Sequence, residues 1–307
     1  MFKRILPFLT LLVLFAALSV ATPHFLTGMN MASLVRQTAV INLIALGATL
    51  VIIAGGIDLS AGSMMALAGL LGCLAMERGA GSGTGIVAGL AVGAAAGLFN
   101  GLVITRMGIS PFIVTLGTLG IYRGLALLIS DGLPVHGLPK DFSFLGEGAI
   151  AHVPFVLLLL IVCAAAVHFL LVHTRMGRYA YAIGSNPEAA RYAGVPVAFH
   201  TTSVYAVCGL LTGLAGMVES SRLMTGQPTA GQGYELQAIA AVVIGGGSLR
   251  GGEGSVAGTL IGAMIMGLLS NGSDLLGISP YLQQAIIGAV IILVVWVDEL
   301  RRRKMNR

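Results

Sequence analysis

Three places in an otherwise apolar chain carry polar side chains that could do chemistry. Asp58 stands in GGIDLSAGS at 55–63, Arg123 stands in TLGIYRGLALLIS, and the stretch 219–240 (ESSRLMTGQPTAGQGYELQAIA) is rich in Gln, Thr, Ser and Tyr. A carboxylate or guanidinium near a membrane is suited to bind a proton, an ion or a substrate group. Hydroxyl and amide groups hydrogen-bond the hydroxyls of a polar solute.

Each of these places also has a plainer structural interpretation. Asp58 or Ser60 can cap a helix that begins after the GGIDLS turn by accepting backbone N–H groups, with Asp58 then touching water. Arg123 can be an anchor bonded to a carbonyl or an acid, because a lone guanidinium in lipid costs several kcal/mol. The outer stretch can be an ordinary hydrated connection or the mouth of a sugar pathway. The candidate pathway or gate residues are Asp58, Arg123, Gln227, Thr229 and Tyr234.

Motifs of enzymes and of metal or cofactor sites are not found in the sequence. It has no HExxH, GxSxG or GxxxxGK[ST] pattern, and the histidines mostly stand at loops or at the ends of apolar runs. GGGSLRGGEG at 245–254 lacks the lysine and the preceding strand of a phosphate-binding loop, which favours a tight turn between two short helices. The three cysteines are far apart inside apolar runs, so we expect small core residues. The chain is therefore not expected to be an enzyme, and no catalytic, cofactor-binding or metal-binding residues are expected on it.

The elements that must position these residues are membrane-spanning helices. Hydrophobic residues make up 56% of the chain, charged residues 9%, and the mean hydropathy is +0.94. Soluble domains carry about 25% charged residues. The net charge is +5, and the basic residues lie between apolar runs and in the tail, which indicates membrane topology rather than nucleic-acid binding.

An all-α polytopic membrane protein with about ten transmembrane helices is predicted, in a single transmembrane domain over 1–307. The eighth predicted span has only about 13 residues, fewer than the roughly 20 that cross a bilayer, and could form a re-entrant pair with the ninth. The predicted spans are 5–21, 38–55, 61–76, 84–104, 112–130, 153–172, 199–218, 236–248, 255–270 and 281–297.

The distribution of basic residues orients these spans. With ten spans, most of the 17 Lys and Arg residues fall on the side of the two termini. The positive-inside rule then makes the termini and the loop at 173–198 cytoplasmic, and turns the loops at 131–152 and 219–235 outward. The first apolar run is short enough for a cleaved signal peptide, but we favour a retained helix because a second run follows closely. The exceptions to the charge asymmetry are Arg36, Arg78, Lys140 and Arg222 outside and Arg123 within a span.

Glycines recur at helical spacing in two of the predicted spans. Gly89, Gly93, Gly97 and Gly101 share one helix face, and GSVAGTLIGAMIMG at 254–267 has a similar composition. Small residues let helices approach closely. We expect packing inside one chain, with a face that lines a conduit as the alternative.

A short helix is predicted between two spans, in NPEAARYAGVPV at 186–197. Asn186 is a good N-cap, Pro187 is suited to the first turn, and Glu188 favours the positive end of the helix dipole. Gly194 and Pro196 end the helix. The sequence therefore predicts a water-exposed helix over 187–193 in the cytoplasmic loop 173–198.

Glu188-Ala189-Ala190 with Gly194 resembles the EAAxxxG motif of the membrane subunits of ABC importers. Together with GGIDLSAGS, YAIGSNPEAARYAGV and QPTAGQGYELQAIAAVVIGGGSLRGGEGSVAGTLIGA, it resembles the ribose/monosaccharide branch of those permeases from about residue 38 to 297. One departure is that VPVAFHTTSV follows Gly194, where many such permeases have Ile-x-Leu-Pro. Contacts beyond Gly194 are therefore not inferred from the resemblance.

The resemblance implies a permease subunit of a sugar importer in a bacterial cytoplasmic membrane, working by alternating access. Its implied partners are an ATP-binding subunit that carries ATP and Mg, a periplasmic or lipid-anchored sugar-binding protein, and a second permease copy or close paralogue. Glu188, Ala189, Ala190 and Gly194 would couple the permease to the ATPase, with 189 and 190 small enough to let the helix sit close in the groove of the ATPase. QPTAGQGYEL makes ribose or a related pentose the expected sugar.

Two other classes of protein remain open from the residues. A proton- or sodium-coupled secondary transporter would use Asp58 and Arg123 as a relay and broken helices as its binding site, but it needs acids in mid-span, which the predicted spans lack. A purely structural or channel-forming subunit would need no docking helix.

Overall fold

The computed structural model describes residues 2–305, without the side chains of 2–5, 294 and 297–305. Lys3, Arg4, the basic run 301–304 and Arg307, on which the charge argument partly rests, lie outside the described side chains. Within the described residues the elements are α1 (Phe2–Ala21), α2 (Gly28–Ile53), α3 (Ala61–Glu77), α4 (Ser82–Met107), α5 (Pro111–Ile129), η1 (Lys140–Ser143), α6 (Phe144–Glu147), β1 (Ala149–Ile150), β2 (Val153–Pro154), α7 (Phe155–His173), α8 (Arg175–Ser185), α9 (Pro187–Tyr192), α10 (Val197–Leu223), α11 (Tyr234–Ile244), α12 (Val256–Leu275) and α13 (Pro280–Met305).

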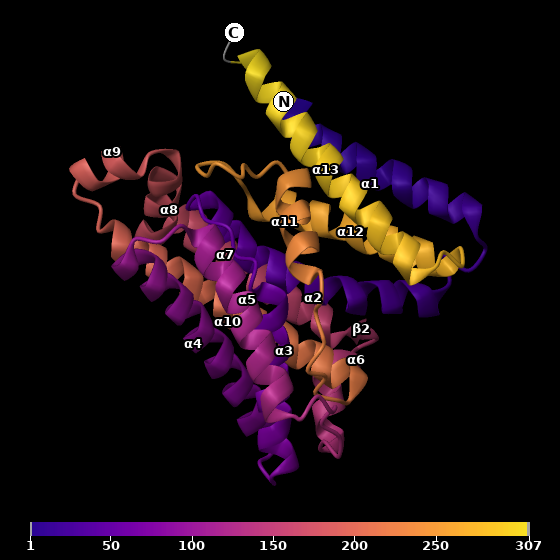
Figure 1. Ribbon diagram of the computed structural model, residues 1–307. Coiled ribbons are helices and arrows are strands. Elements are labelled where there is room, and N and C mark those ends of the chain that lie inside the picture. Colours follow the sequence, from indigo (N-terminus) through magenta and orange to yellow (C-terminus); the bar gives the residue numbers. More distant parts are fainter. Residues whose placement is uncertain (1, 306–307) are drawn as a thin grey trace.

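Each of the ten predicted spans is occupied by a helix: α1 to α5, α7 and α10 to α13 (Figure 1). Six of these are long and apolar enough to cross a membrane by length and composition alone, and α3 and α11 are among the shorter apolar helices. The all-α class and the approximate number of helices are therefore confirmed. The only strands in the described part of the chain are the two-residue β1 and β2, which form a hairpin just before α7.

Several boundaries differ from the predicted ones for local reasons. Helix α2 begins at Gly28, well before residue 38, because Thr27 accepts the N–H of Asn30 and caps the helix there. Helix α10 continues to Leu223 and takes the first residues of the predicted outer loop. Helix α11 has 11 residues and ends before Gly245. At about 1.5 Å per residue it is roughly half as long as the hydrocarbon layer is thick, so it cannot cross alone.

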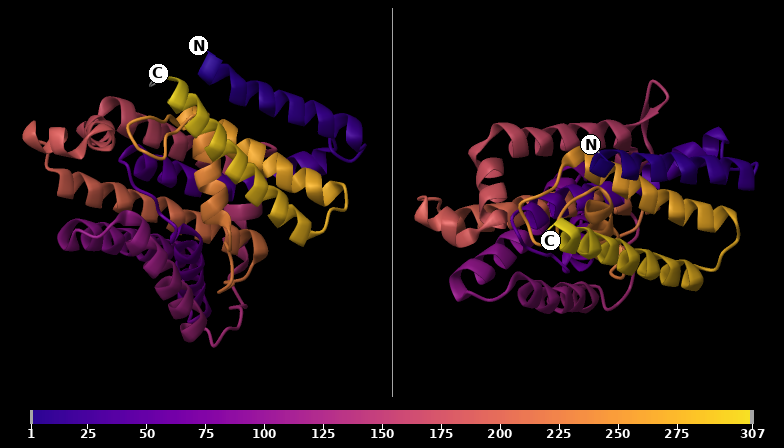
Figure 2. Two further views of the ribbon diagram at one scale, coloured as in Figure 1. Left: turned by 45° about the horizontal axis from the view of Figure 1, so that its top comes forward. Right: turned by 90° about the horizontal axis from the view of Figure 1, so that it is seen from above.

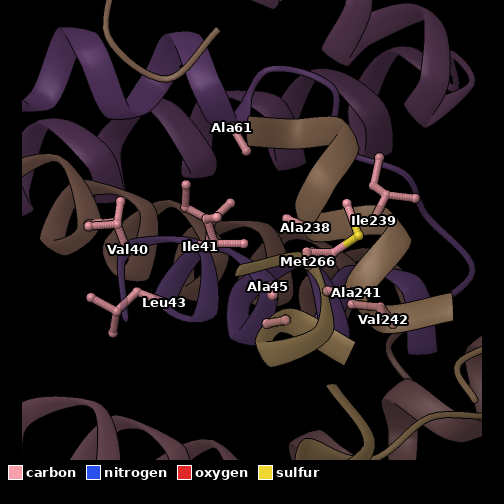
Figure 3. Close-up of a cluster of buried hydrophobic side chains, with 14 of the residues drawn as sticks. Val40, Ile41, Leu43, Ala45, Ala61, Ala238, Ile239, Ala241, Val242 and Met266 are labelled. Atoms are coloured by element: carbon pink, nitrogen blue, oxygen red, sulfur yellow. The ribbon is translucent and has the colours of Figure 1, made fainter. Parts of the chain in front are cut away.

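Helix α2 lies at the centre of the bundle. Most of its side chains are buried, and it contacts α7, α10, α11 and α12. Figure 3 shows Ile41 and Ala45 of α2 beside Ala238 and Val242 of α11 and Met266 of α12, in one cluster of buried apolar side chains. A helix that is apolar all round belongs in an interior. Helix α7 is also strongly apolar but mostly exposed, as expected of a helix that faces lipid.

Helices α4 and α10 pack along a seam of glycines. A Cβ added to Gly93 would overlap the carbonyl oxygen of Gly209, and a Cβ added to Gly209 would overlap that of Gly93. Gly97 and Gly101 meet the backbone of α10 in the same way, and Thr105 and Thr202 share a hydrogen bond of 3.0 Å at one end of the seam. The backbones come this close because the glycines of α4 have no side chain. The expected role of this face in packing within the chain is confirmed.

Three views locate the outer parts of the molecule. Helices α1 and α13 flank α12 when the molecule is seen from above, and α9 stands at the periphery in every view (Figures 1 and 2). The beginning of α1, the end of α13 and the glycine-rich loop between α11 and α12 lie on the same side of Figure 1 as α8 and α9.

Candidate functional site

Helix α9 is formed by the residues that predict it. The side chain of Asn186 accepts the N–H of Ala189 at 2.9 Å, Pro187 occupies the first turn, and Glu188 is the acidic residue of that turn. Gly194 has a φ of 82°, in the left-handed region that glycine adopts at low cost, and ends the helix. The predicted short helix at this place is confirmed, with its last residue at Tyr192.

The exposed face of α9 consists of Glu188, Ala189, Arg191 and Tyr192. Ala190 is buried against its own chain, at 5% exposure, whereas Ala189 is exposed. Successive residues of a helix are about 100° apart, so Ala190 can face the bundle while Ala189 faces outward. Tyr192 is 91% exposed. The EAAxxxG pattern gave no reason to single it out.

Helix α8 ties α9 to the bundle. Thr174 caps α8 by accepting the N–H of Gly177, and Ala180 and Ile183 are buried. The phenol of Tyr181 donates a hydrogen bond of 2.9 Å to the carbonyl oxygen of Gly254, in the glycine-rich loop between α11 and α12. Burial raises the pKa of the Tyr181 phenol, so this O–H keeps its proton and remains a donor. The docking segment, defined here as residues 173–198, is thus hydrogen-bonded to a second loop.

A cluster of buried polar groups surrounds the break between α2 and α3. Asp58 Oδ1 accepts the Ser60 N–H at 2.8 Å and the Ser60 hydroxyl at 2.6 Å. The Asn100 amide of α4 donates to Ser60 Oγ at 2.9 Å, and the Tyr122 hydroxyl of α5 donates to Asn100 Oδ1 at 3.0 Å. Cys208 of α10 lies 4.0 Å from Asp58 Oδ2. These contacts link the break to three helices.

The position of Asp58 differs from the expectation that it touches water. Asp58 is only 4% exposed because α4, α5 and α10 close over the break. The capping interpretation holds only in part: Asp58 binds the N–H of Ser60, the residue just before α3, and Ser60 makes no side-chain cap of that helix. A buried carboxylate keeps its place through such hydrogen bonds.

Arg123 anchors the outer loop. Its guanidinium donates to the carbonyl oxygens of Pro228 at 2.6 Å and Ala230 at 2.9 Å. Of the two interpretations of Arg123, the structure supports the structural anchor bonded to a carbonyl. The loop is also held from the other side, since Gly226 and Val135 pair as a β-bridge and the Thr225 hydroxyl donates to Val135 O at 3.0 Å.

The remaining candidate residues belong to this outer loop or follow it. The Gln227 amide donates to Thr229 Oγ1 at 3.3 Å. Tyr234 begins α11 and is half-buried near the Glu219–Arg222 ion pair, in which both charged groups meet in a bidentate contact at 3.0 and 3.1 Å. The structure thus separates the five candidates. Arg123, Gln227, Thr229 and Tyr234 lie at the outer loop, and Asp58 belongs to the buried cluster.

Sequence reasoning missed the partners of Asp58. Asn100 is fully buried, and Tyr122 is 5% exposed although it adjoins Arg123. An amide inside the glycine-rich run GLFNGL was a visible signal, because buried polar groups in membrane helices need partners. Gly93 and Gly97 were identified correctly, but their partners on α10 were not.

No group of three His, Cys, Asp or Glu side chains that could hold a metal ion occurs among the described residues. The three cysteines are free, with Cys73 and Cys208 buried and Cys163 half-buried. The loop 245–254 is a turn between α11 and α12, as predicted, and Ser248 N–H bonds to Glu253 O across it at 3.1 Å. The loop is therefore closed by a backbone hydrogen bond.

The described residues thus form an apolar bundle of ten helices with one short exposed helix at its edge, which is typical of a multi-pass membrane protein. The chain belongs to the family described as "Branched-chain amino acid transport system / permease component", whose profile matches residues 30–295. It is thus a permease component of an ABC transporter and a multi-pass membrane protein. Its own role is transport, not catalysis.

Relatives named for sugars align with nearly the whole chain. The ribose import permease protein of Escherichia coli strain K12 is 42% identical over 298 residues, covering 96% of this chain and 93% of that protein. The ribose import permease protein of Bacillus subtilis strain 168 is also 42% identical, over 96% of this chain and 92% of the relative. The D-allose transport system permease protein of E. coli K12 is 37% identical over 92% of this chain and 87% of the relative. No solved structure matches the chain.

Proposed function

We propose that this permease carries ribose or a closely related pentose into a bacterial cell by alternating access, driven by a separate ATP-binding subunit. The observation that carries the proposal is helix α9. It is capped, exposed on one face and buried at Ala190 on the other, and it stands at the edge of the molecule (Figure 2). Such a helix fits the groove of a partner.

The partners follow from what the described residues can do. The ATP-binding subunit would hold ATP and Mg and would bind the face of Glu188 and Ala189, while Gly194 ends the helix. A periplasmic or lipid-anchored binding protein would deliver the sugar to the outer loop 224–233. A second copy of this chain, or a close paralogue, would complete the pathway. The termini and the docking segment would lie in the cytoplasm, and the protein in the cytoplasmic membrane.

In the proposed cycle, closure of the ATPase moves α9 and α8, and the bundle changes from inward-open to outward-open. The sugar then needs only weak contacts inside, because a ligand shifts a two-state equilibrium only by its differential affinity. Gln227, Thr229 and Tyr234 are the proposed contacts at the outer mouth, and Arg123 holds their loop against α5. Asp58 is the proposed gate residue, at the break between α2 and α3.

The names of the relatives support ribose over other sugars, and two of them allow a direct comparison of substrates. Competition for uptake of labelled ribose by unlabelled ribose, allose and arabinose would be measured in proteoliposomes with the ATPase and the binding protein. Ribose should compete best. Equal competition by all three, or transport of allose but not ribose, would overturn the choice of sugar.

An ion-coupled transporter receives no support from the arrangement of the two residues it requires. Asp58 bonds to Ser60, whereas Arg123 bonds to Pro228 and Ala230, so the two share no hydrogen-bond partner, although Glu235 interacts electrostatically with both. A proton relay needs groups that exchange a hydrogen bond. Addition of an ionophore to the same proteoliposomes should leave the uptake rate unchanged.

A further inference from the structure

The C-terminal ends of α2 and α8 meet the loop between α11 and α12 in a contact made by glycines. A Cβ added to Gly184 would overlap the carbonyl oxygen of Ile53 and would lie 2.6 Å from the nitrogen of Gly252. A Cβ on Gly251 would lie 2.7 Å from the Cα of Gly184 and 2.8 Å from the Cα of Gly55. We name Gly55, Gly184, Gly251 and Gly252 the glycine junction.

A backbone hydrogen bond holds the glycine junction together. The N–H of Gly252 donates to Ile53 O at 2.9 Å, so the loop is bonded directly to the end of α2. Gly55, Gly251 and Gly252 have φ angles of 81°, 88° and 75°, where a side chain causes strain. Gly184 is helical, so only its lack of space excludes a side chain. Substitution at Gly184 therefore tests the contact without placing a side chain at a strained φ angle.

The loop at the glycine junction is closed on itself and bonded to α8. Ser248 N–H donates to Glu253 O at 3.1 Å, and Gly251 N–H donates to Ser248 O at 2.9 Å. Tyr181 donates from its phenol to Gly254 O at 2.9 Å, one turn before Gly184. A loop fixed at both ends moves with the helix it contacts.

The chain continues from the glycine junction into the buried polar cluster. Gly56 has no space for a Cβ, which would lie 2.5 Å from the Tyr205 hydroxyl. The next carbonyl, of Ile57, accepts hydrogen bonds from Thr115 Oγ1 at 3.1 Å and from the Tyr205 hydroxyl at 3.4 Å. Asp58 follows. Residues 53–58 thus contact α8 at one end, and at the other end they are hydrogen-bonded to α5 and α10.

We propose that the glycine junction transmits the movement of the docking segment to the break at 54–60 and to α11 and α12. The inference rests on the proposed function, because it assumes that a partner moves α9. Closely packed interiors switch between discrete arrangements instead of deforming gradually. A rigid contact between α8, α2 and the α11–α12 loop makes these three elements move together.

The experiment compares sugar transported per ATP hydrolysed in proteoliposomes that contain the ATPase and the binding protein. The variants are Gly184→Ala and Tyr181→Phe, and the matched control is Gly83→Ala, since nothing lies within 4 Å of a Cβ at Gly83. Gly184→Ala should lower the transport ratio about tenfold, within the usual range of coupling between sites, while hydrolysis continues. Tyr181→Phe should lower the ratio in the same direction by a smaller factor, and Gly83→Ala should match the wild type.

Two results would overturn the proposal. One is a wild-type transport ratio in Gly184→Ala. The other is a proportional loss of hydrolysis and transport in both variants, which would mean that the contact serves only assembly. If Gly184→Ala does not fold, Tyr181→Phe decides, because it removes a single hydroxyl. Failure of the wild type to transport any sugar with ATP would contradict the proposed function instead.

Discussion

Arg123 on α5 donates a hydrogen bond of 2.6 Å to the carbonyl oxygen of Pro228, a residue 105 positions further along the chain. The second arm of the same guanidinium binds Ala230 O. Two bonds from one planar group fix both the position and the direction of the loop. The loop 224–233 is therefore attached to α5, so a movement of α5 also moves this loop.

Arg123→Met removes both bonds and leaves two carbonyls without their donor. We expect the free energy of unfolding in detergent to fall by about 1–3 kcal/mol, the usual cost of losing a hydrogen bond to a charged group. Arg123→Lys should lie between the wild type and Arg123→Met, because an ammonium lacks the planar fork that binds both carbonyls. Thermal unfolding of the three proteins measures this, and an unchanged midpoint in Arg123→Met would contradict the anchor.

Asp58→Asn and Asp58→Ala separate the charge of the Asp58 side chain from its ability to accept a hydrogen bond. Asn keeps an oxygen that can accept from Ser60, whereas Ala leaves the buried Ser60 N–H without its acceptor, at a cost of about 1–3 kcal/mol. We therefore expect Asp58→Asn to fold almost like the wild type and Asp58→Ala to be less stable.

Transport by the Asp58 variants tests the ion-coupled alternative. Asp58→Asn should retain ATP-driven uptake, since the proposed gate needs hydrogen bonds and not a titrating proton. A stable Asp58→Asn variant that hydrolyses ATP but transports nothing would show that the carboxylate itself is required.

Gly209→Ala places a methyl group against the backbone of Gly93 and 2.8 Å from the Cα of Gly97. The two helices must separate, and we expect a loss of about 1–3 kcal/mol, as for other overpacked interiors. Gly83→Ala adds the same methyl group to α4 in open space and should be neutral or slightly stabilising. Unfolding in detergent compares the two, and equal stability would argue against the seam.

Ala189→Glu and Ala190→Glu make the same change at neighbouring positions of α9. Ala189 is exposed, so its variant should fold normally but bind the ATP-binding subunit less tightly. Ala190 is 5% exposed, and a buried unpaired carboxylate should destabilise α9 itself. Co-purification with the ATPase and limited proteolysis of the 173–198 segment distinguish the two effects. If both variants bind the ATPase like the wild type, α9 is not the docking surface.

Local signals in the sequence were sufficient to predict α9 and most of the apolar helices. Asn186, Pro187 and Gly194 act on their own neighbours, so the limits of that helix follow from a few residues. The glycine spacing on α4 likewise predicted a close helix contact. Both predictions rest on a sequence pattern that lies within one element.

Contacts between distant parts of the chain could not be predicted in the same way. Asn100 reaches Ser60 across 40 residues, and Arg123 reaches Pro228 across 105. Neither pairing has a local pattern, and it depends on which faces of the helices meet. The burial of Asp58 and the inward direction of Ala190 were missed for this reason, since each depends on a neighbouring element that covers it.

ATP-dependent uptake of labelled ribose tests the central claim most directly. The permease would be reconstituted in liposomes with its ATP-binding subunit and binding protein, as the wild type and as Glu188→Lys, and assembly would be checked first. The account predicts uptake that requires ATP in the wild type and is lost in an assembled, folded Glu188→Lys variant. Uptake driven by an ion gradient without ATP would contradict it.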